Sequence, residues 1–115
     1  MMKIIFTTKG SDMNAMMDPR FGRAEFLLLY DEETGKHTVH DNLEAANSAH
    51  GAGPLAAQKV YELKADAIVT GNGPGEKAAA TLQVADIAIF VGAGSMKVHE
   101  ALSSFQQGKL EKIKL

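Results

Sequence analysis

The sequence has no cysteine among its 115 residues. This absence excludes disulfide bonds, a thiolate nucleophile, and zinc or iron–sulfur sites that are ligated by cysteine. A chain without cysteine is compatible with a reducing compartment. We therefore expect a cytoplasmic protein.

Long apolar runs and an excess of positive charge are also missing. No apolar run approaches the roughly 20 residues of a membrane span, and the apolar run in residues 1–6 is too short for the core of a signal peptide. The chain has 12 basic and 14 acidic residues, whereas binding to nucleic-acid phosphates requires a basic surface. We expect neither a membrane nor a nucleic acid as partner.

The length and the hydrophobic fraction suit one globular unit. Hydrophobic residues make up 45% of the chain, which is enough for one core without disulfide or metal support. The sequence shows no internal repeat, linker or shift in composition. We expect residues 1–115 to form a single domain.

Short apolar segments rich in β-branched and aromatic residues predict the strands. The segments are residues 3–8, 24–30, 36–41, 67–70 and 87–91. The second is apolar almost throughout, which predicts burial on both faces, and the third is more polar, which predicts an edge strand. The alternating residues 110–115 fit either a short extra strand or a tail.

Three helices are predicted between and after these strands. Pro54 suits the start of a helix over residues 54–63. A second helix covers about residues 74–84, and a third runs from an N-cap at Ser95 to about residue 107. The order of elements predicts an α/β protein with a mixed five-stranded sheet in the order 3-2-1-4-5, with strand 2 antiparallel and helices on both faces.

In this topology strands 1, 3, 4 and 5 point the same way, so the loops that follow them meet at one edge of the sheet. The loops are residues 9–23, 42–53, 71–75 and 92–95. Proteins with α/β sheets bind ligands at such an edge. We expect these loops to form a binding rim.

Glycine-rich turns at this rim precede the second and third helices. Gly71-Asn72-Gly73 and Gly92-Ala93-Gly94 each lead to a helix N-terminus, where free N–H groups favour an anion. Lys77 and Lys97 lie in the first turns, where a bound anion would explain a basic residue. Alternatively, the glycines only permit tight turns. Neither turn matches the phosphate-binding or dinucleotide motif.

The first rim loop also carries charged and sulfur-containing side chains. Arg20 and Arg23 flank Phe21-Gly22, and arginine pairs well with carboxylates and phosphates; either one could instead pair with Asp18 or Asp12. The methionines of this loop, Met13, Met16 and Met17, suit a soft metal, an adaptable contact surface, or simple packing on the core.

Histidines provide the candidate metal ligand. His50 precedes Gly51-Ala52-Gly53-Pro54 at a helix entry, where it is either a ligand or donor at the rim or an ordinary loop histidine. His37 and His40 are three residues apart on a predicted strand, so they point to opposite faces. We interpret both, and His99, as structural or solvated side chains.

No catalytic set stands out. The sequence shows no Ser-His-acid arrangement. The predicted sheet order is similar to that of ribonuclease H-like nucleases, which need clustered carboxylates for their metals, but residues 3–8 contain none. This argues against a two-metal nuclease.

These residues together resemble a known family. Asp18-Pro19-Arg20-Phe21-Gly22-Arg23-Ala24, followed by an apolar strand and Asp31-Glu32-Glu33-Thr34-Gly35, resembles the dinitrogenase iron–molybdenum cofactor biosynthesis family. The matching pieces further along the chain are His50-Gly51-Ala52-Gly53, Gly71-Asn72-Gly73-Pro74, Ala101-Leu102 and Gly108-Lys109-Leu110. The resemblance covers nearly the whole chain, and its first segment is the most specific.

The resemblance implies a three-layer α/β/α, ribonuclease H-like fold without nuclease activity. Some relatives carry iron–molybdenum cofactor or an iron–sulfur precursor during nitrogenase assembly, and others are stand-alone domains of unknown role. Because this chain lacks cysteine, a cluster would have to be held by His50, by other side chains, or by backbone N–H groups that contact its sulfides.

Three hypotheses follow from the sequence. The first is a non-enzymatic binding module for an iron–sulfur or iron–molybdenum cluster or a small anion, with His50 as the metal ligand. The second is a regulatory domain that contacts a protein through the loop from Met13 to Arg23. The third is an enzyme acting on a small phosphorylated substrate, supported only by the glycine turns and Lys77. The binding residues of the first hypothesis are Arg20, Phe21, Gly22, Arg23, His50, Gly51, Gly53, Gly71, Asn72, Gly73, Gly92 and Gly94.

Overall fold

The centre of the sheet is strand β1 (Lys3–Thr8) in the computed structural model, which describes residues 2–48 and 51–113. Its β-branched and aromatic side chains favour a strand, and every residue after Lys3 is buried. Strand β2 (Phe26–Asp31) runs antiparallel to one side of β1, and strand β4 (Ala67–Val69) runs parallel to the other side. A strand that is buried along almost its whole length therefore lies in the middle of the sheet.

The sheet has six strands in the order β3-β2-β1-β4-β5-β6. Strand β3 (Lys36–Asp41) is at one edge, as predicted, and β5 (Ala88–Val91) pairs parallel with β4. The predicted order of the first five strands is confirmed, but the five-stranded count is wrong. Strand β6 (Glu111–Ile113) pairs antiparallel with β5. It thereby covers backbone N–H and C=O groups that β5 would otherwise expose at an open edge.

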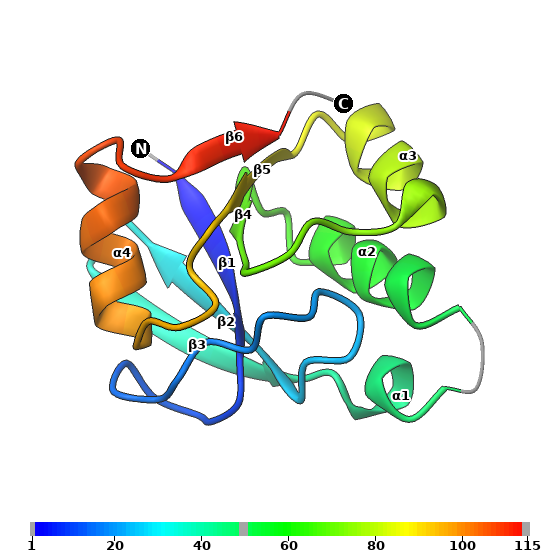
Figure 1. Ribbon diagram of the computed structural model, residues 1–115, viewed down its shortest axis with the longest axis horizontal. Helices are drawn as coiled ribbons and strands as arrows, with labels where there is room; N and C mark the ends of the chain where they lie inside the picture. Colours follow the sequence, from blue (N-terminus) through cyan, green and yellow to red (C-terminus); the bar gives the residue numbers. More distant parts are fainter. Residues whose placement is uncertain (1, 49–50, 114–115) are drawn as a thin grey trace.

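Helices cover both faces of the sheet (Figure 1). Helices α1 (Leu43–Ala46), α2 (Ala52–Glu62) and α3 (Glu76–Val84) lie on one side and α4 (Val98–Gln106) lies on the other. The short α1 was not predicted. None of the helices within the described residues is long and apolar enough to cross a bilayer.

Helix α4 starts later than the sequence predicts. Its N-cap is Lys97, whose N–H donates to Oε1 of Glu100 at 2.8 Å, so the prediction of Ser95 as N-cap is wrong. The reason is a tertiary contact: Met16 forms a β-bridge with Lys97, and Lys97 is held in an extended conformation with ψ of 159°. The helix can begin only after this residue.

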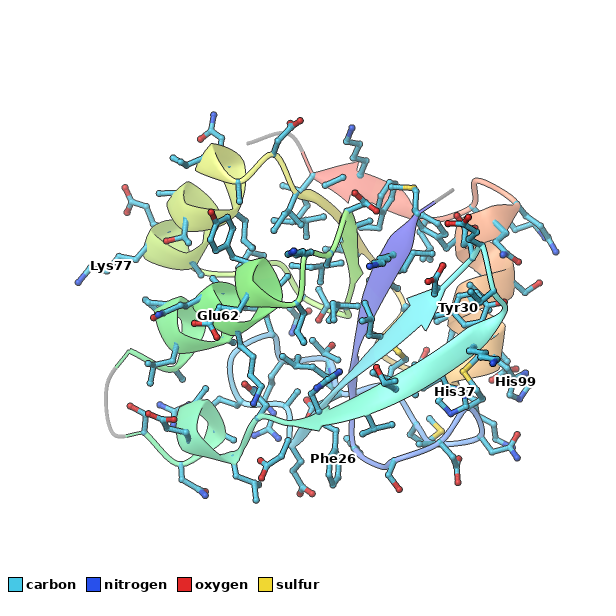
Figure 2. The ribbon with its side chains drawn as sticks, turned by 180° about the vertical axis from the view of Figure 1, so that it is seen from behind. Phe26, Tyr30, His37, Glu62, Lys77 and His99 are labelled. Atoms are coloured by element: carbon cyan, nitrogen blue, oxygen red, sulfur yellow. The ribbon has the colours of Figure 1, made fainter. Side chains whose placement is uncertain are left out.

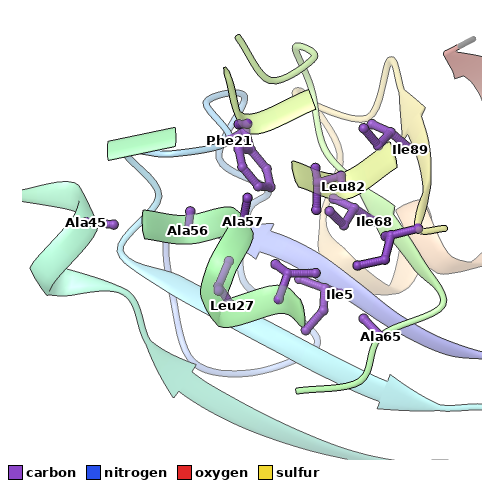
Figure 3. Close-up of a cluster of buried hydrophobic side chains, with 13 residues drawn as sticks. Ile5, Phe21, Leu27, Ala45, Ala56, Ala57, Ala65, Ile68, Leu82 and Ile89 are labelled. Atoms are coloured by element: carbon purple, nitrogen blue, oxygen red, sulfur yellow. The ribbon is translucent and has the colours of Figure 1, made fainter. Parts of the chain in front are cut away.

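Alternation along the strands builds two cores. Ile5, Leu27 and Ile68 point toward α2 and α3, where the Phe21 ring joins them from the first loop (Figure 3). Their neighbours Ile4, Leu28 and Val69 point toward α4. Strand β2 is apolar on both faces because β1 and β3 flank it and helices cover each face of the sheet. Leu27 therefore lies in one core and Leu28 in the other.

Candidate functional site

The loops after β1, β4 and β5 are joined by backbone hydrogen bonds. The N–H of Asp18 donates to the carbonyl of Thr7 at 2.8 Å, and the N–H of Asn72 donates to the carbonyl of Pro19 at 2.7 Å. The N–H of Gly92 donates to the carbonyl of Gly71 at 3.1 Å. The convergence of loops that the topology predicts is therefore present.

Glycines allow these loops to touch. A Cβ atom placed on Gly71 would lie 2.5 Å from Cα of Pro19 and 2.8 Å from Cα of Gly94. Backbone atoms cannot move aside as a flexible side chain can, so these positions require glycine for packing. Gly71 and Gly94 are accounted for by this junction without a ligand.

Asp18 and Arg20 form an ion pair that holds the first loop. The Asp18 carboxylate is buried and accepts the backbone N–H of Arg20 at 2.9 Å, Nε at 3.0 Å and Nη2 at 3.0 Å. Burial alone would raise the pKa of Asp18, but the hydrogen bonds and charge of Arg20 outweigh it and lower that pKa. Of the pairings that the sequence left open for the arginines, the structure shows Arg20 with Asp18. The Arg20 side chain nevertheless remains 59% exposed.

Arg23 is engaged with a different part of the rim. Its Nη1 donates to the carbonyl of Ala46 at 3.0 Å and to that of Ser48. From the other side, Nδ2 of Asn42 donates to the carbonyl of Ala24 at 2.9 Å. Together these bonds fasten the segment after β3 to the end of the first loop.

Gly22 completes this attachment. A Cβ atom placed on Gly22 would lie 2.7 Å from the backbone N of Gly53. The end of the first loop thus packs directly on the first turn of α2. Only a residue without a side chain permits that approach.

An open groove of about 670 Å³ lies between the first loop and the N-termini of α2 and α3. The first-turn N–H groups of a helix have no partner within the helix, and the helix dipole favours negative charge there. In Figure 2 the Lys77 side chain, in the first turn of α3, extends away from the body of the protein. The two helix ends therefore offer donors and positive potential to the groove, while Glu76 in the first turn of α3 adds one negative charge to its lining. Its lining residues are Arg20, Phe21, Gly22, Arg23, Gly51, Ala52, Gly53, Pro54, Asn72, Gly73, Pro74, Gly75, Glu76, Lys77 and Ala78.

Most of the residues predicted for the site meet at this groove. The predicted residues that line it are Arg20, Phe21, Gly22, Arg23, Gly51, Gly53, Asn72 and Gly73. Gly71, Gly92 and Gly94 are not among its lining residues. His50 lies outside the described residues. Gly75 and Glu76 line the groove but were not predicted, although the start of a helix directly after Pro74 was a usable signal.

The N-terminus of α4 does not offer free donors in the same way. The N–H of Val98 donates to the carbonyl of Ala15 at 2.9 Å, and the N–H of His99 donates to the carbonyl of Met13 at 2.9 Å. The first loop therefore occupies the position in which an anion was expected. Met17 of this loop is fully buried, whereas Met16 is 42% exposed.

The donor set of the groove suits an anion better than a bare metal ion. Within residues 2–48 and 51–113, no group of three or more His, Cys, Asp or Glu side chains could hold a metal ion. Backbone N–H groups and a guanidinium instead match oxygen or sulfide acceptors that carry negative charge.

The same framework recurs in a known family and in solved structures. The family described as dinitrogenase iron–molybdenum cofactor matches residues 2–108. The chain belongs to this family. The search of curated proteins found no match to this chain.

Two of the similar structures are clear relatives. The apo form of the orange protein from Desulfovibrio gigas is 32% identical, with a TM-score of 0.93 over 98% of this chain and 93% of that one. A NifB-like protein from Thermotoga is 30% identical, with a TM-score of 0.83 over 97% of this chain and 93% of that one. The crystal structure of PH0822, at 18% identity and a TM-score of 0.73 over 96% and 95% of the two chains, shares the fold.

Proposed function

We propose that this chain is a non-enzymatic binding module whose groove receives a preassembled anionic metallocluster, either iron–molybdenum cofactor or an iron–sulfur precursor. One observation carries the proposal: the N-termini of α2 and α3 line a single groove together with the exposed Arg20 side chain. Each helix end contributes about half a positive charge. An anion in this groove would therefore be attracted from several sides.

The groove is suited to a cluster that is already assembled when it binds. Cluster sulfides can accept hydrogen bonds from backbone N–H groups, and Gly51 and Gly75 at the two helix starts let a ligand approach the backbone closely. His50 directly precedes Gly51 in the sequence. In this proposal His50 is the side chain that ligates metal, and the remaining contacts are hydrogen bonds and charge.

The relatives support a function connected with cofactors. The family is described by the iron–molybdenum cofactor, and one similar structure is that of a NifB-like protein. The orange protein was solved in an apo form. These names agree with a small cofactor-binding module, and the groove supplies the position that we propose for the ligand.

The end of β1 supports binding rather than hydrolysis. We propose a ribonuclease H-like scaffold that has hydroxyl groups where the nucleases need carboxylates. Oγ1 of Thr7 is hydrogen-bonded to Oγ1 of Thr70 at 2.8 Å and to the carbonyl of Asp18 at 2.9 Å. Oγ1 of Thr8 donates to the carbonyl of Gly10 at 2.7 Å. These hydroxyls hold loops together.

A charge test at Gly75 addresses the groove directly. A Cβ atom at Gly75 would meet nothing within 4 Å, and its backbone is extended, with φ of −66°. Gly75→Asp and Gly75→Asn therefore fit equally well, and both side chains cap a helix. The pair differs in charge alone, so it isolates the electrostatic contribution.

The experiment is an anaerobic titration with isolated iron–molybdenum cofactor and with a synthetic [4Fe–4S] cluster, followed by absorbance. We expect saturable binding by the wild type and an affinity at least about tenfold lower for Gly75→Asp than for Gly75→Asn. Equal affinities of the two variants would show that the cluster does not bind in this groove. His50→Ala is measured in parallel, and unchanged binding would remove only His50 from the site.

A further inference from the structure

Strand β3 leaves one side of the sheet open (Figure 2). It is the outermost strand next to β2. The opposite edge strand, β6, has three residues, whereas β3 has six, and residues 36–38 are exposed. An edge strand of this length presents outward N–H and C=O groups to any strand that can pair with it, and of these the carbonyl of Asp41 already accepts Nζ of Lys59.

The hydrogen-bond phase of β3 identifies the groups that face outward. The N–H of Asn42 donates to the carbonyl of Glu25 at 2.9 Å, in the same register that pairs β3 with β2. Because bonding direction alternates along an antiparallel strand, Lys36, Thr38 and His40 bond toward β2. His37, Val39 and Asp41 therefore direct their backbone groups away from the sheet.

We infer that β3 pairs antiparallel with β3 of a second copy of this chain, about a two-fold axis at Val39. An antiparallel pair of identical strands is the arrangement that a two-fold axis produces. Outward residues must face outward residues, so Val39 faces Val39 of the second copy and His37 faces its Asp41. This register forms on the order of six interstrand hydrogen bonds. It joins the two sheets into one.

Hydrogen-bond complementarity between an imidazole N–H and a carboxylate selects this register. It places an imidazole opposite a carboxylate twice, once on each side of the axis, and such opposed pairs stabilise a sheet. Shifting the axis to Thr38 would instead place Lys36 opposite His40, and shifting it to His40 would place two histidines opposite each other. Both shifts also lose hydrogen bonds, since fewer outward residues then face one another.

The hollow at the end of β3 can receive the side chain of Lys36 from the second copy. In this register Lys36 of the second copy lies opposite Asn42, which lines this hollow of about 230 Å³ together with the acidic residues Asp41, Glu44 and Glu62 and the basic residue Lys59. Lys36 shares its face of the strand with Thr38, whose cross-strand neighbour Leu29 packs on the core beneath α2. The ammonium group thus reaches the acidic side of the hollow.

Asp41 is compatible with this pairing. Its carbonyl accepts Nζ of Lys59, and its Oδ1 accepts the N–H of Leu43 at 2.5 Å. A carbonyl oxygen and a carboxylate each have further lone pairs for His37 of the second copy. The contact is small compared with a standard interface, so the dimer is a weak one that forms with rising concentration. It does not depend on the proposed groove ligand.

Sedimentation velocity between about 10 µM and 1 mM tests the inference. We expect a reversible monomer–dimer equilibrium for the wild type. His37→Asp and His37→Lys change the same exposed side chain. The Asp variant is repelled by Asp41 of the second copy, and the Lys variant is attracted to it. The Asp variant should dimerise about tenfold more weakly than the Lys variant. Val39→Pro, which removes an outward N–H and spares the ladder to β2, should abolish the dimer.

Amide hydrogen exchange gives an independent measurement on the same samples. The N–H groups of His37, Val39 and Asp41 should become protected as the concentration rises, and those of β6 should not. A wild type that stays monomeric at about 1 mM would overturn the inference. So would a dimer that leaves these three amides unprotected, or equal association of the two His37 variants.

Discussion

Pro19 packs directly against Gly71, so that a Cβ atom on Gly71 would lie 2.5 Å from Cα of Pro19 and 2.8 Å from its Cβ. The contact joins the loop after β1 to the loop after β4. It is reinforced by the hydrogen bond from the N–H of Asn72 to the carbonyl of Pro19. The Asp-Pro-Arg-Phe-Gly segment is therefore part of the packing of the rim as well as a wall of the groove.

Substitution of Gly71 should separate these loops. We expect Gly71→Ala to lower the free energy of unfolding by about 1–3 kcal/mol, because the added methyl group meets backbone atoms on two sides. Urea denaturation followed by circular dichroism measures the change. Gly75→Ala is the matched control, since its Cβ has open space, and it should stay within about 0.5 kcal/mol of the wild type. Equal stabilities of the two variants would contradict the tight junction.

The buried Asp18 carboxylate should make the protein sensitive to acid. Its pKa is lowered in the folded state because the hydrogen bonds and charge of Arg20 outweigh the opposing effect of burial. A carboxyl group of this kind stabilises the fold above its unfolded pKa, and the contribution is lost as the pH falls through the folded value. Asp18→Asn should therefore cost on the order of 1–3 kcal/mol at neutral pH. The difference from the wild type should shrink below the ordinary value of 3.8.

The control for this prediction is Asp12→Asn, because the Asp12 carboxylate is exposed and accepts the N–H of Asn14 in its own loop, at 2.9 Å. Urea melts of the three proteins between pH 2.5 and pH 7, as an approximate range around the carboxyl pKa, separate the two cases. A pH-independent gap between wild type and Asp18→Asn would show that the ion pair is not the cause.

Arg23 should act on the segment after β3. Replacing it with alanine removes the donors to the carbonyls of Ala46 and Ser48, so residues 42–48 should exchange their amide hydrogens faster. Arg20→Ala is the comparison, because Arg20 bonds to Asp18 instead. Mass-spectrometric hydrogen exchange on the two variants compares the exchange rates of residues 42–48. Equal exchange in this segment would contradict the anchoring role.

Phe21 should contribute chiefly through burial. The ring is 4% exposed and belongs to the core beneath α2 and α3. Phe21→Ala should cost about 3–5 kcal/mol, and Phe21→Leu considerably less because much of the volume is kept. Thermal or urea unfolding gives both values. If Phe21→Leu keeps full stability but loses the cluster in the titration described above, the ring contacts the ligand.

Much of the fold was predictable because it depends on local pattern. The apolar run of β1, the polar edge strand β3 and the helix after Pro54 follow from side-chain periodicity and turn chemistry. The start of α4 was not predictable in this way. Its first turn is determined by Met16 bridging to Lys97, a contact between residues far apart in the chain.

The strand count depended on tertiary context as well. Residues 110–115 mix apolar and charged side chains, which fits a strand or a tail, and only the open edge of β5 makes residues 111–113 the strand β6. The same holds for the arginines of the rim. Their residue type indicated pairing with carboxylates, but the choice of Asp18 for Arg20 and of two carbonyls for Arg23 follows from the folded loops.

The amino-acid sequence by itself determined the class of the protein: the absence of cysteine, the order of strands and helices, and a motif that resembles one family. The tertiary structure decided which of the rim residues support the fold and which face a groove. The physical reason is that close backbone approaches, such as Pro19 on Gly71, and buried pairs, such as Asp18 with Arg20, exist only between segments brought together by folding.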